Sequence, residues 1–203
     1  MYTSKGYLRV IIGPMYSGKS TLLLDIIRQF SKETVRNRFD NNFVNKQETN
    51  NKKFMVINHS SDTRYGKNVI STHNKQQYPC YSLSKLSEIE VSPEYNKIYK
   101  ESKRIIIDES QFFDSKSLYQ FVYESVIFLH KTVIVSGLSG DSNQQKFGGI
   151  LDLLPLADKI DVLYATCSHC GEIAPFTKRI VNNTSKTLVG SVGTYEPVCR
   201  DHL

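Results

Sequence analysis

The stretch GPMYSGKS at residues 13–20 constrains the fold more than any other part of the sequence. It fits the pattern G-x-x-x-x-G-K-[S/T], in which the backbone N–H groups of a glycine-rich loop surround a phosphate. The apolar run YLRVII before it is typical of a strand, and TLLLDIIRQF after it predicts a helix over 19–30. Strand, loop and helix in this order predict an α/β domain that binds a nucleotide.

The residues of this loop have different expected roles. Gly13 and Gly18 let backbone amides turn toward an anion, and the start of the helix adds a favourable dipole. Lys19 reaches the outer phosphates, and the Ser20 hydroxyl is a ligand for Mg²⁺ that accompanies ATP. The other loop residues expected to contact phosphate are Pro14, Met15, Tyr16 and Ser17.

Two acidic residues end the apolar run RIIIDE at 104–109. Asp108 is placed to hold Mg²⁺ opposite Ser20, as at the corresponding strand end of other phosphate-loop proteins. Glu109 is a candidate general base, because a carboxylate beside the terminal phosphate can take a proton from an attacking oxygen. That oxygen can belong to water or to a substrate hydroxyl, so these residues leave ATP hydrolysis and phosphoryl transfer both open.

The remaining pattern predicts a parallel sheet covered by helices on both faces, as in phosphate-loop nucleotide-binding proteins. Apolar runs at 53–58, 104–109 and 131–138 alternate with helical segments, and each run is apolar throughout. The stretch FGGILDLLPLADKI is expected to begin as a helix that Pro155 limits. We therefore predict a nucleotide-binding domain over 1–161, with a disordered insertion at 31–52 and a lid-like segment at 59–82, and a small second domain over 162–203.

The second domain carries a metal-ligand pattern. Cys167 and Cys170 form one C-x-x-C pair, and Cys199 and His202 form a C-x-x-H pair. Four such ligands complete a tetrahedral zinc site, so the Zn²⁺ is expected to be structural. His169 is a rival ligand with poorer spacing, and a redox-active C-x-x-C pair is the alternative reading.

Composition limits the partners and the compartment. The formal charge is +6, but residues 28–53 hold seven Lys/Arg against three Asp/Glu, so the excess gathers in the asparagine-rich insertion. We therefore expect no nucleic-acid-binding face. No apolar run approaches the ~20 residues of a membrane span, and four cysteines do not form a disulfide framework. These features favour a cytoplasmic protein with no membrane partner.

Several further motifs together resemble the thymidine kinases of the cellular and poxvirus-like type. They are DTRY at 62–65, TH at 72–73, IDESQFF at 107–113, KTVIVSGL, KFGGILDLLPLAD, FTKR at 176–179 and Y-x-x-V-C at 195–199. The resemblance covers almost the whole chain except 31–52. It implies ATP-dependent phosphorylation of thymidine at the 5′-hydroxyl, with deoxyuridine left open as a second substrate. It also implies a homotetramer and feedback binding of thymidine triphosphate.

The resemblance also assigns roles to individual residues. Glu109 would take the proton of the 5′-hydroxyl, and Arg64 would stabilise charge on the transferring group. Asp62, Thr63, Ser110 and Gln111 would lie on the phosphate side. The nucleoside side would comprise Met15, Phe112, Leu138, Ser142, Thr177 and Tyr195, together with the backbone of Lys186, Thr187, Leu188, Val189 and Gly190.

Two positions depart from the family pattern. Ser110 stands where the family has glycine, so its backbone must avoid positive φ. Ser142 stands where cellular and viral members have an aromatic residue, and Phe147 is a candidate to supply the missing contact. Both departures bear on nucleoside affinity rather than on the type of reaction.

Two other functions are weighed against the kinase. One is an ATPase coupled to a nucleic-acid-binding zinc ribbon, in which Glu109 activates water. The other is a non-enzymatic zinc module with a degenerate nucleotide site, which the intact set Lys19, Ser20, Asp108 and Glu109 disfavours.

Overall fold

A six-stranded parallel sheet forms the centre of the protein. The computed structural model describes residues 5–36, 54–63, 66, 68–72, 76–182 and 193–203. The strand order is β5-β2-β6-β7-β1-β8, and every neighbouring pair is parallel. The strands are β1 (Tyr7–Gly13), β2 (Phe54–His59), β5 (Tyr81–Leu83), β6 (Arg104–Asp108), β7 (Thr132–Leu138) and β8 (Lys159–Val162). The predicted parallel α/β class is confirmed.

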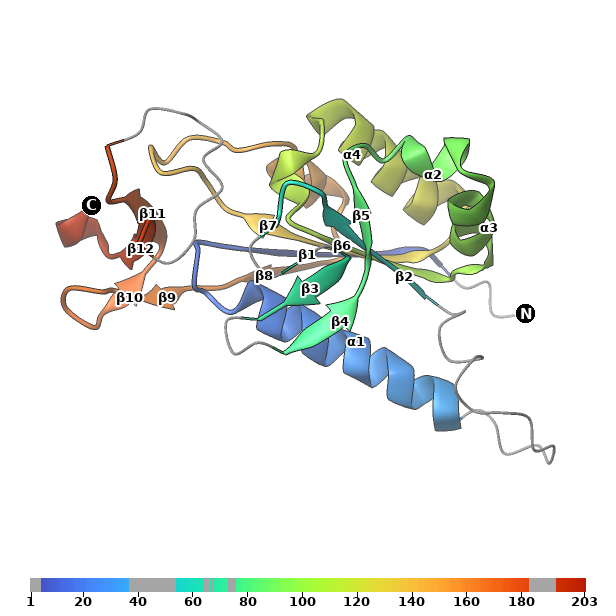
Figure 1. Cartoon of the computed structure of the whole chain (residues 1–203), viewed down its shortest axis with the longest axis horizontal. Helices are drawn as coiled ribbons and strands as arrows, with labels where there is room; N and C mark the ends of the chain where they lie inside the picture. Colours follow the sequence, from blue (N-terminus) through green and yellow to red (C-terminus); the bar gives the residue numbers. More distant parts are fainter. Residues whose placement is uncertain (1–4, 37–53, 64–65, 67, 73–75, 183–192) are drawn as a thin grey trace.

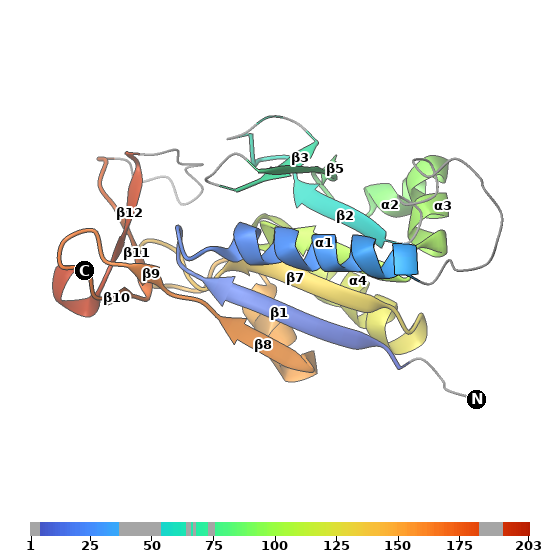
Figure 2. The ribbon, with the colours of Figure 1, turned by 90° about the horizontal axis from the view of Figure 1, so that it is seen from below.

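Helices cover both faces of this sheet (Figure 1). Helix α1 (Lys19–Arg36) packs on one face together with the hairpin of β3 (Val69–Ser71) and β4 (Gln77–Pro79). The other face carries α2 (Glu88–Val91), α3 (Pro93–Glu101), α4 (Ser115–Tyr123), a π-helical turn (Glu124–Phe128) and a 3₁₀ turn (Ile150–Leu156). Figure 2 shows α1 lying along the strands, with β1 and β7 beside it.

The uninterrupted apolar character of the strands follows from this double coverage. In β6, Ile105 and Ile107 join the core beneath α4, whereas Ile106 joins the core beneath α1. Successive side chains of a strand point to opposite faces, so a sheet with two covered faces needs apolar residues at every position.

Helix α1 is longer than predicted. It continues to Arg36, six residues past the expected end, so the first part of the predicted insertion is helical. The rest of the insertion, 37–52, lies outside the described residues. By contrast, α3 begins at Pro93 as expected, and the Ser92 hydroxyl caps it by accepting a hydrogen bond from the Tyr95 N–H.

The stretch FGGILDLLPLADKI contains the expected helix, but in 3₁₀ rather than α form. This 3₁₀ helix, Ile150–Leu156, ends just after Pro155, and the chain then enters β8 at the edge of the sheet, which the pattern did not predict. Contacts with β1 favour this strand, since Asp158 accepts a hydrogen bond from the Leu8 N–H and Asp161 pairs with Arg9. These partners lie about 150 residues earlier in the chain, beyond the reach of a local pattern.

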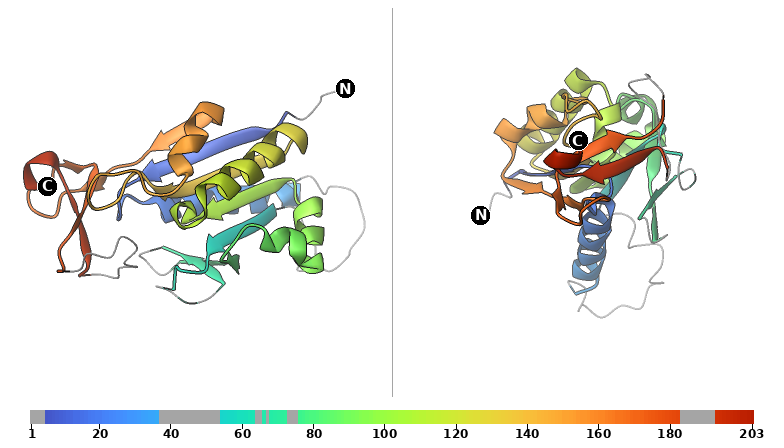
Figure 3. Two further views of the ribbon diagram at one scale, coloured as in Figure 1. Left: turned by 90° about the horizontal axis from the view of Figure 1, so that it is seen from above. Right: turned by 90° about the vertical axis from the view of Figure 1, so that its left-hand side faces the viewer.

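A small β-rich lobe follows at one end of the sheet (Figure 3). It contains two antiparallel pairs, β9 (Ala165–Thr166) with β10 (Ile173–Ala174) and β11 (Phe176–Arg179) with β12 (Tyr195–Val198). A short 3₁₀ turn, Arg200–His202, comes last. Within the described residues, none of the helices has the length and apolar character that crossing a membrane requires.

Candidate active site

The phosphate loop lies between the end of β1 and the start of α1. Its backbone is left-handed at Tyr16 (φ 64°) and Gly18 (φ 84°), which turns the chain sharply around the loop. Lys19 is 8% exposed, and its ammonium group donates to the carbonyl oxygens of Gly13 (3.2 Å) and Pro14 (2.6 Å). The sequence pattern therefore produces the closed loop that binds phosphate in other proteins.

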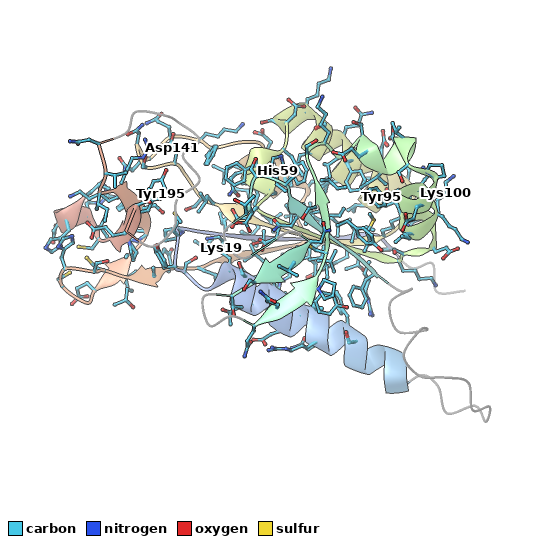
Figure 4. All side chains as sticks on the ribbon, viewed as in Figure 1. Lys19, His59, Tyr95, Lys100, Asp141 and Tyr195 are labelled. Carbon is cyan, nitrogen blue, oxygen red and sulfur yellow. The ribbon has the colours of Figure 1, made fainter. Side chains whose placement is uncertain are left out.

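A cavity of about 440 Å³ opens above this loop. Its walls come from the loop, from the region around the β3–β4 hairpin, and from the ends of β6 and β7 at Glu109 and Leu138. The lining residues are Met15, Tyr16, Ser17, Gly18, Lys19, Ser20, Thr21, Ser71, Thr72, Glu109 and Leu138. Figure 4 shows Lys19 between the sheet and the C-terminal lobe, on which Tyr195 lies.

Ser20 and Asp108 meet at the base of the loop. The Ser20 hydroxyl donates to a carboxylate oxygen of Asp108 at 3.4 Å, and Asp108 is 3% exposed. Burial, with a smaller contribution from the neighbouring Glu109 carboxylate, raises the pKa of Asp108 to about 6. A hydroxyl and a buried carboxylate are oxygen ligands of the kind Mg²⁺ prefers, so this pair suits the cation that accompanies ATP.

Glu109 adopts an unusual backbone conformation. It follows β6 directly with φ 48° and ψ 38°, in the left-handed region that few non-glycine residues occupy. Ser110 then begins a 3₁₀ turn, Ser110–Phe112, and is not among the described residues with positive φ. The expectation that Ser110 avoids positive φ is confirmed, and the strain lies one residue earlier, at the candidate base.

Aromatic rings gather behind the 3₁₀ turn. The Phe112 ring lies 5.6 Å from that of Phe147, edge to face, and 5.6 Å from that of His59. His59 is fixed by two backbone contacts, since Ser61 N–H donates to Nδ1 and Nε2 faces the Ser84 carbonyl. His59 was absent from the sequence-based site, because no motif ties the end of β2 to Phe112.

The C-terminal lobe contacts the phosphate loop through Thr177. Its side chain is 5% exposed, and Oγ1 accepts a hydrogen bond from the Met15 N–H at 2.9 Å. Tyr195 is also buried, and its hydroxyl accepts from the Arg179 guanidinium at 2.9 Å. The structure therefore brings Met15 and Thr177 together, although 162 positions separate them in the chain.

Ser142 is not brought to this cavity. It lines a second cavity of about 610 Å³ between the loop after β7 and the lobe. Phe147, the candidate substitute for the missing aromatic residue, contacts Phe112. Arg64 and the stretch 186–190 lie outside the described residues. Asp62 is described, and it accepts a hydrogen bond from the Asn58 amide at 3.1 Å.

Four side chains of the lobe form a compact candidate metal centre. The ligand atoms of Cys167, Cys170, Cys199 and His202 all lie within 4.8 Å of one another. His202 Nδ1 is 3.1 Å from the Cys199 sulfur, and the Cys170 and Cys199 sulfurs are 3.6 Å apart. Three thiols and one imidazole in this space suit tetrahedral zinc.

The rival ligand His169 is engaged elsewhere. Its Nε2 lies 3.0 Å from a carboxylate oxygen of Glu196, and its ring stacks on that of His202 at 4.9 Å. Of the two histidines, His202 is therefore the one whose nitrogen joins the three sulfurs.

The cavity also includes residues to which the sequence pattern gave no role. Thr21 is an exposed residue in the first turn of α1, Ser71 is the last residue of β3, and Thr72 follows it. Thr72 belongs to the motif TH at 72–73, which supported the family resemblance. That motif did not indicate that Thr72 would line the same cavity as the phosphate loop.

Comparison with known proteins identifies the family. The family model "Thymidine kinase" matches residues 6–203. The chain is 36% identical to a thymidine kinase of Oryza sativa over 97% of this chain and 66% of the relative. It is 32% identical to the cytosolic thymidine kinase of Gallus gallus, over 97% of this chain and 76% of the relative. It is also 32% identical to a thymidine kinase of Variola virus, over 96% and 95% of the two chains. The chain belongs to the thymidine kinase family.

Proposed function

We propose that the protein transfers the terminal phosphate of ATP to the 5′-hydroxyl of thymidine, with Glu109 as general base. One observation carries this proposal. A single cavity is lined by Lys19 and Ser20 of the phosphate loop, by Glu109, and by the apolar Leu138. A phosphate and a hydroxyl-bearing apolar substrate can therefore lie on either side of one carboxylate. Family membership supports thymidine as that substrate.

Each residue has a defined part in the reaction. The loop amides and Lys19 bind the phosphates of ATP, and Ser20 and Asp108 would hold Mg²⁺, which supplies positive charge to the phosphate oxygens. Glu109 accepts the proton of the 5′-hydroxyl as its oxygen forms a bond to the terminal phosphorus. The bond from that phosphorus to the bridging oxygen breaks, and ADP leaves with the electron pair. We assign Arg64 to the stabilisation of this charge.

The nucleoside would occupy the side of the cavity that Leu138 and Met15 line. The assignment of Phe112, Tyr195 and the 186–190 backbone to the base rests on the family motif. The contact between Thr177 and Met15 supports a role for the lobe in shaping this side. A structural Zn²⁺ on the four lobe ligands would hold the lobe together, and metal binding of this kind contributes folding free energy.

Other properties follow from the family pattern. We expect a homotetramer, feedback binding of thymidine triphosphate, and a reducing cytoplasmic environment that keeps the zinc thiols available. Deoxyuridine is the natural competitor to test as a second substrate.

The test compares Glu109→Gln with Glu124→Gln. Both changes remove one carboxylate that accepts a hydrogen bond from a glutamine, but Glu124 lies just after α4, at the start of the π-helical turn, and does not line the cavity. Glu109→Gln should lower turnover by about 10²–10⁴, the usual contribution of a general base. Glu124→Gln should leave turnover unchanged, and neither variant should change thymidine or ATP binding by more than a few-fold.

The same assay separates the kinase from the ATPase. ADP formation by the unchanged protein should require thymidine and should match thymidine monophosphate one for one. Rapid ADP formation without thymidine, stimulated by DNA and abolished in Glu109→Gln, would show instead that the proton comes from water.

A further inference from the structure

Gln111 lies directly behind the proposed base. It is the central residue of the 3₁₀ turn after β6 and is 3% exposed. Its side-chain Nε2 donates to a carboxylate oxygen of Glu109 at 2.5 Å. Its Oε1 accepts from the Leu138 N–H at the end of β7, at 3.1 Å. One side chain therefore joins Glu109 to the neighbouring strand.

The direction of this amide is fixed by its partners. A backbone N–H can only donate, so the oxygen of the amide must face Leu138. The NH₂ group is then left facing Glu109, where it donates to a carboxylate oxygen. Reversing the amide would replace both hydrogen bonds by contacts between like groups, which fixes the orientation without reference to the hydrogen positions.

Strand β7 is shaped to admit this side chain. A Cβ atom at Gly137 would lie 2.7 Å from Gln111 Oε1 and 2.7 Å from Ser110 Oγ. Such distances are far below van der Waals contact, so a larger residue would displace the amide. The absence of a side chain at Gly137 therefore leaves the space that the Gln111 amide occupies.

Gln111 does not itself line the cavity above the phosphate loop, as far as the described residues define it. The two residues it joins, Glu109 and Leu138, both do. The family resemblance alone placed Gln111 among the phosphate-side residues. Its contacts indicate a different role, because a group without access to the cavity can act only through its partners.

We infer that Gln111 is a positioning residue that holds the Glu109 carboxylate toward the substrate hydroxyl and ties it to the nucleoside side of the cavity at Leu138. This inference rests on the proposed function, since it assumes that Glu109 is the base. Glutamate has three rotatable side-chain bonds, and Glu109 lies on a left-handed backbone that surrounding contacts must maintain. The hydrogen bond from Gln111 selects one carboxylate orientation from those available.

The expected effect is on turnover rather than on binding. A misplacement of a catalytic group by about 1 Å can cost 10²-fold in rate. Gln111→Met keeps the length of the side chain but removes both hydrogen bonds. It should lower kcat by about 10- to 100-fold, with KM for ATP and thymidine within about threefold of the unchanged protein.

Gln120→Met is the matched control. Gln120 also donates to a glutamate, Glu124, at 2.9 Å, but on the exposed face of α4. The same chemical change there should leave kcat unchanged.

A double-mutant cycle separates positioning from a purely structural role. If Gln111 acts through the carboxylate, adding Gln111→Met to Glu109→Gln should cause little further loss of kcat, because the base is already absent. Where Gln111→Met does not fold, Gln111→Asn takes its place in the cycle. Asparagine has the same amide on a side chain one methylene shorter, which cannot reach both Glu109 and Leu138.

Two outcomes would overturn the inference. Either Gln111→Met and Gln111→Asn keep full turnover, or their loss multiplies with that of Glu109→Gln as for independent sites. Failure of the proposed function looks different. Either Glu109→Gln alone would keep full thymidine phosphorylation, or the unchanged protein would form ADP rapidly without thymidine, whatever the Gln111 variants do.

Discussion

Replacing Thr177 by valine tests whether the C-terminal lobe holds the phosphate loop in place. Valine matches threonine in shape but lacks the hydroxyl that accepts the Met15 N–H. Because Thr177 is 5% exposed, water cannot easily take over as acceptor. Leaving a buried N–H without an acceptor costs about 1–3 kcal/mol. Met15 is only half-buried, which favours the lower half of that range, about 1–2 kcal/mol.

This free energy can be measured in two ways. In a chain of this size, 1 kcal/mol lowers Tm by about 2–4 °C, so Thr177→Val should melt about 2–8 °C below the unchanged protein. The same 1–2 kcal/mol corresponds to about 5- to 30-fold in an equilibrium constant. If the lost hydrogen bond shifts the phosphate loop out of its active conformation rather than unfolding the protein, kcat/KM for ATP and thymidine should decrease by about 5- to 30-fold.

Thr177→Ser is the matched control, because it keeps the hydroxyl and loses only a methyl group. It should keep most of the activity and of the Tm. The reasoning is refuted if Thr177→Val equals the unchanged protein in both measurements. It is also refuted if Thr177→Ser is as damaging as Thr177→Val, since the hydroxyl would then not be the cause.

Two further predictions concern the lobe and the sheet edge. Metal analysis should find about one zinc per chain; Cys167→Ser should lose it and melt earlier, whereas Cys80→Ser, outside the cluster, should retain it. Folded, active protein without zinc would contradict the assignment. Two hydrogen bonds from Arg9 hold the pKa of Asp161 below its ordinary value, so the pair stabilises the fold above that value and loses its effect as pH falls through the lowered pKa. Asp161→Asn should therefore lower the unfolding free energy by about 1 kcal/mol at pH 7, and an equal loss at pH 3 in denaturant titrations would contradict this.

Local patterns predicted the parts of the site that depend on neighbouring residues. The loop between β1 and α1, the two acids at the end of β6, and the two ligand pairs of the lobe all lie where the sequence indicated. Each depends on a few adjacent residues, because a glycine, a lysine and a helix start create the phosphate loop almost by themselves.

The features that were missed depend on distant partners. Strand β8 forms because β1 offers it an edge, and the helical pattern around Pro155 does not reveal that edge. The role of Gln111 depends on the N–H of Leu138, which folding brings beside it from the next strand. A glutamine in a motif looks the same whether it contacts a ligand or supports another residue, so its contacts had to be seen.

The position of β1 in the sheet has a consequence for the order in which the protein takes shape. Although β1 is made first, its neighbours are β7 and β8, which come more than 120 residues later. During synthesis the apolar first strand must wait for β7 to emerge, while β2, β5 and β6 can already pair with one another. Non-local pairings of this kind form slowly and expose apolar surface in the meantime. Because the phosphate loop extends from the end of β1, the nucleotide site is completed only after β7 has been made and has paired with β1, so ATP cannot guide the steps of folding that come before this.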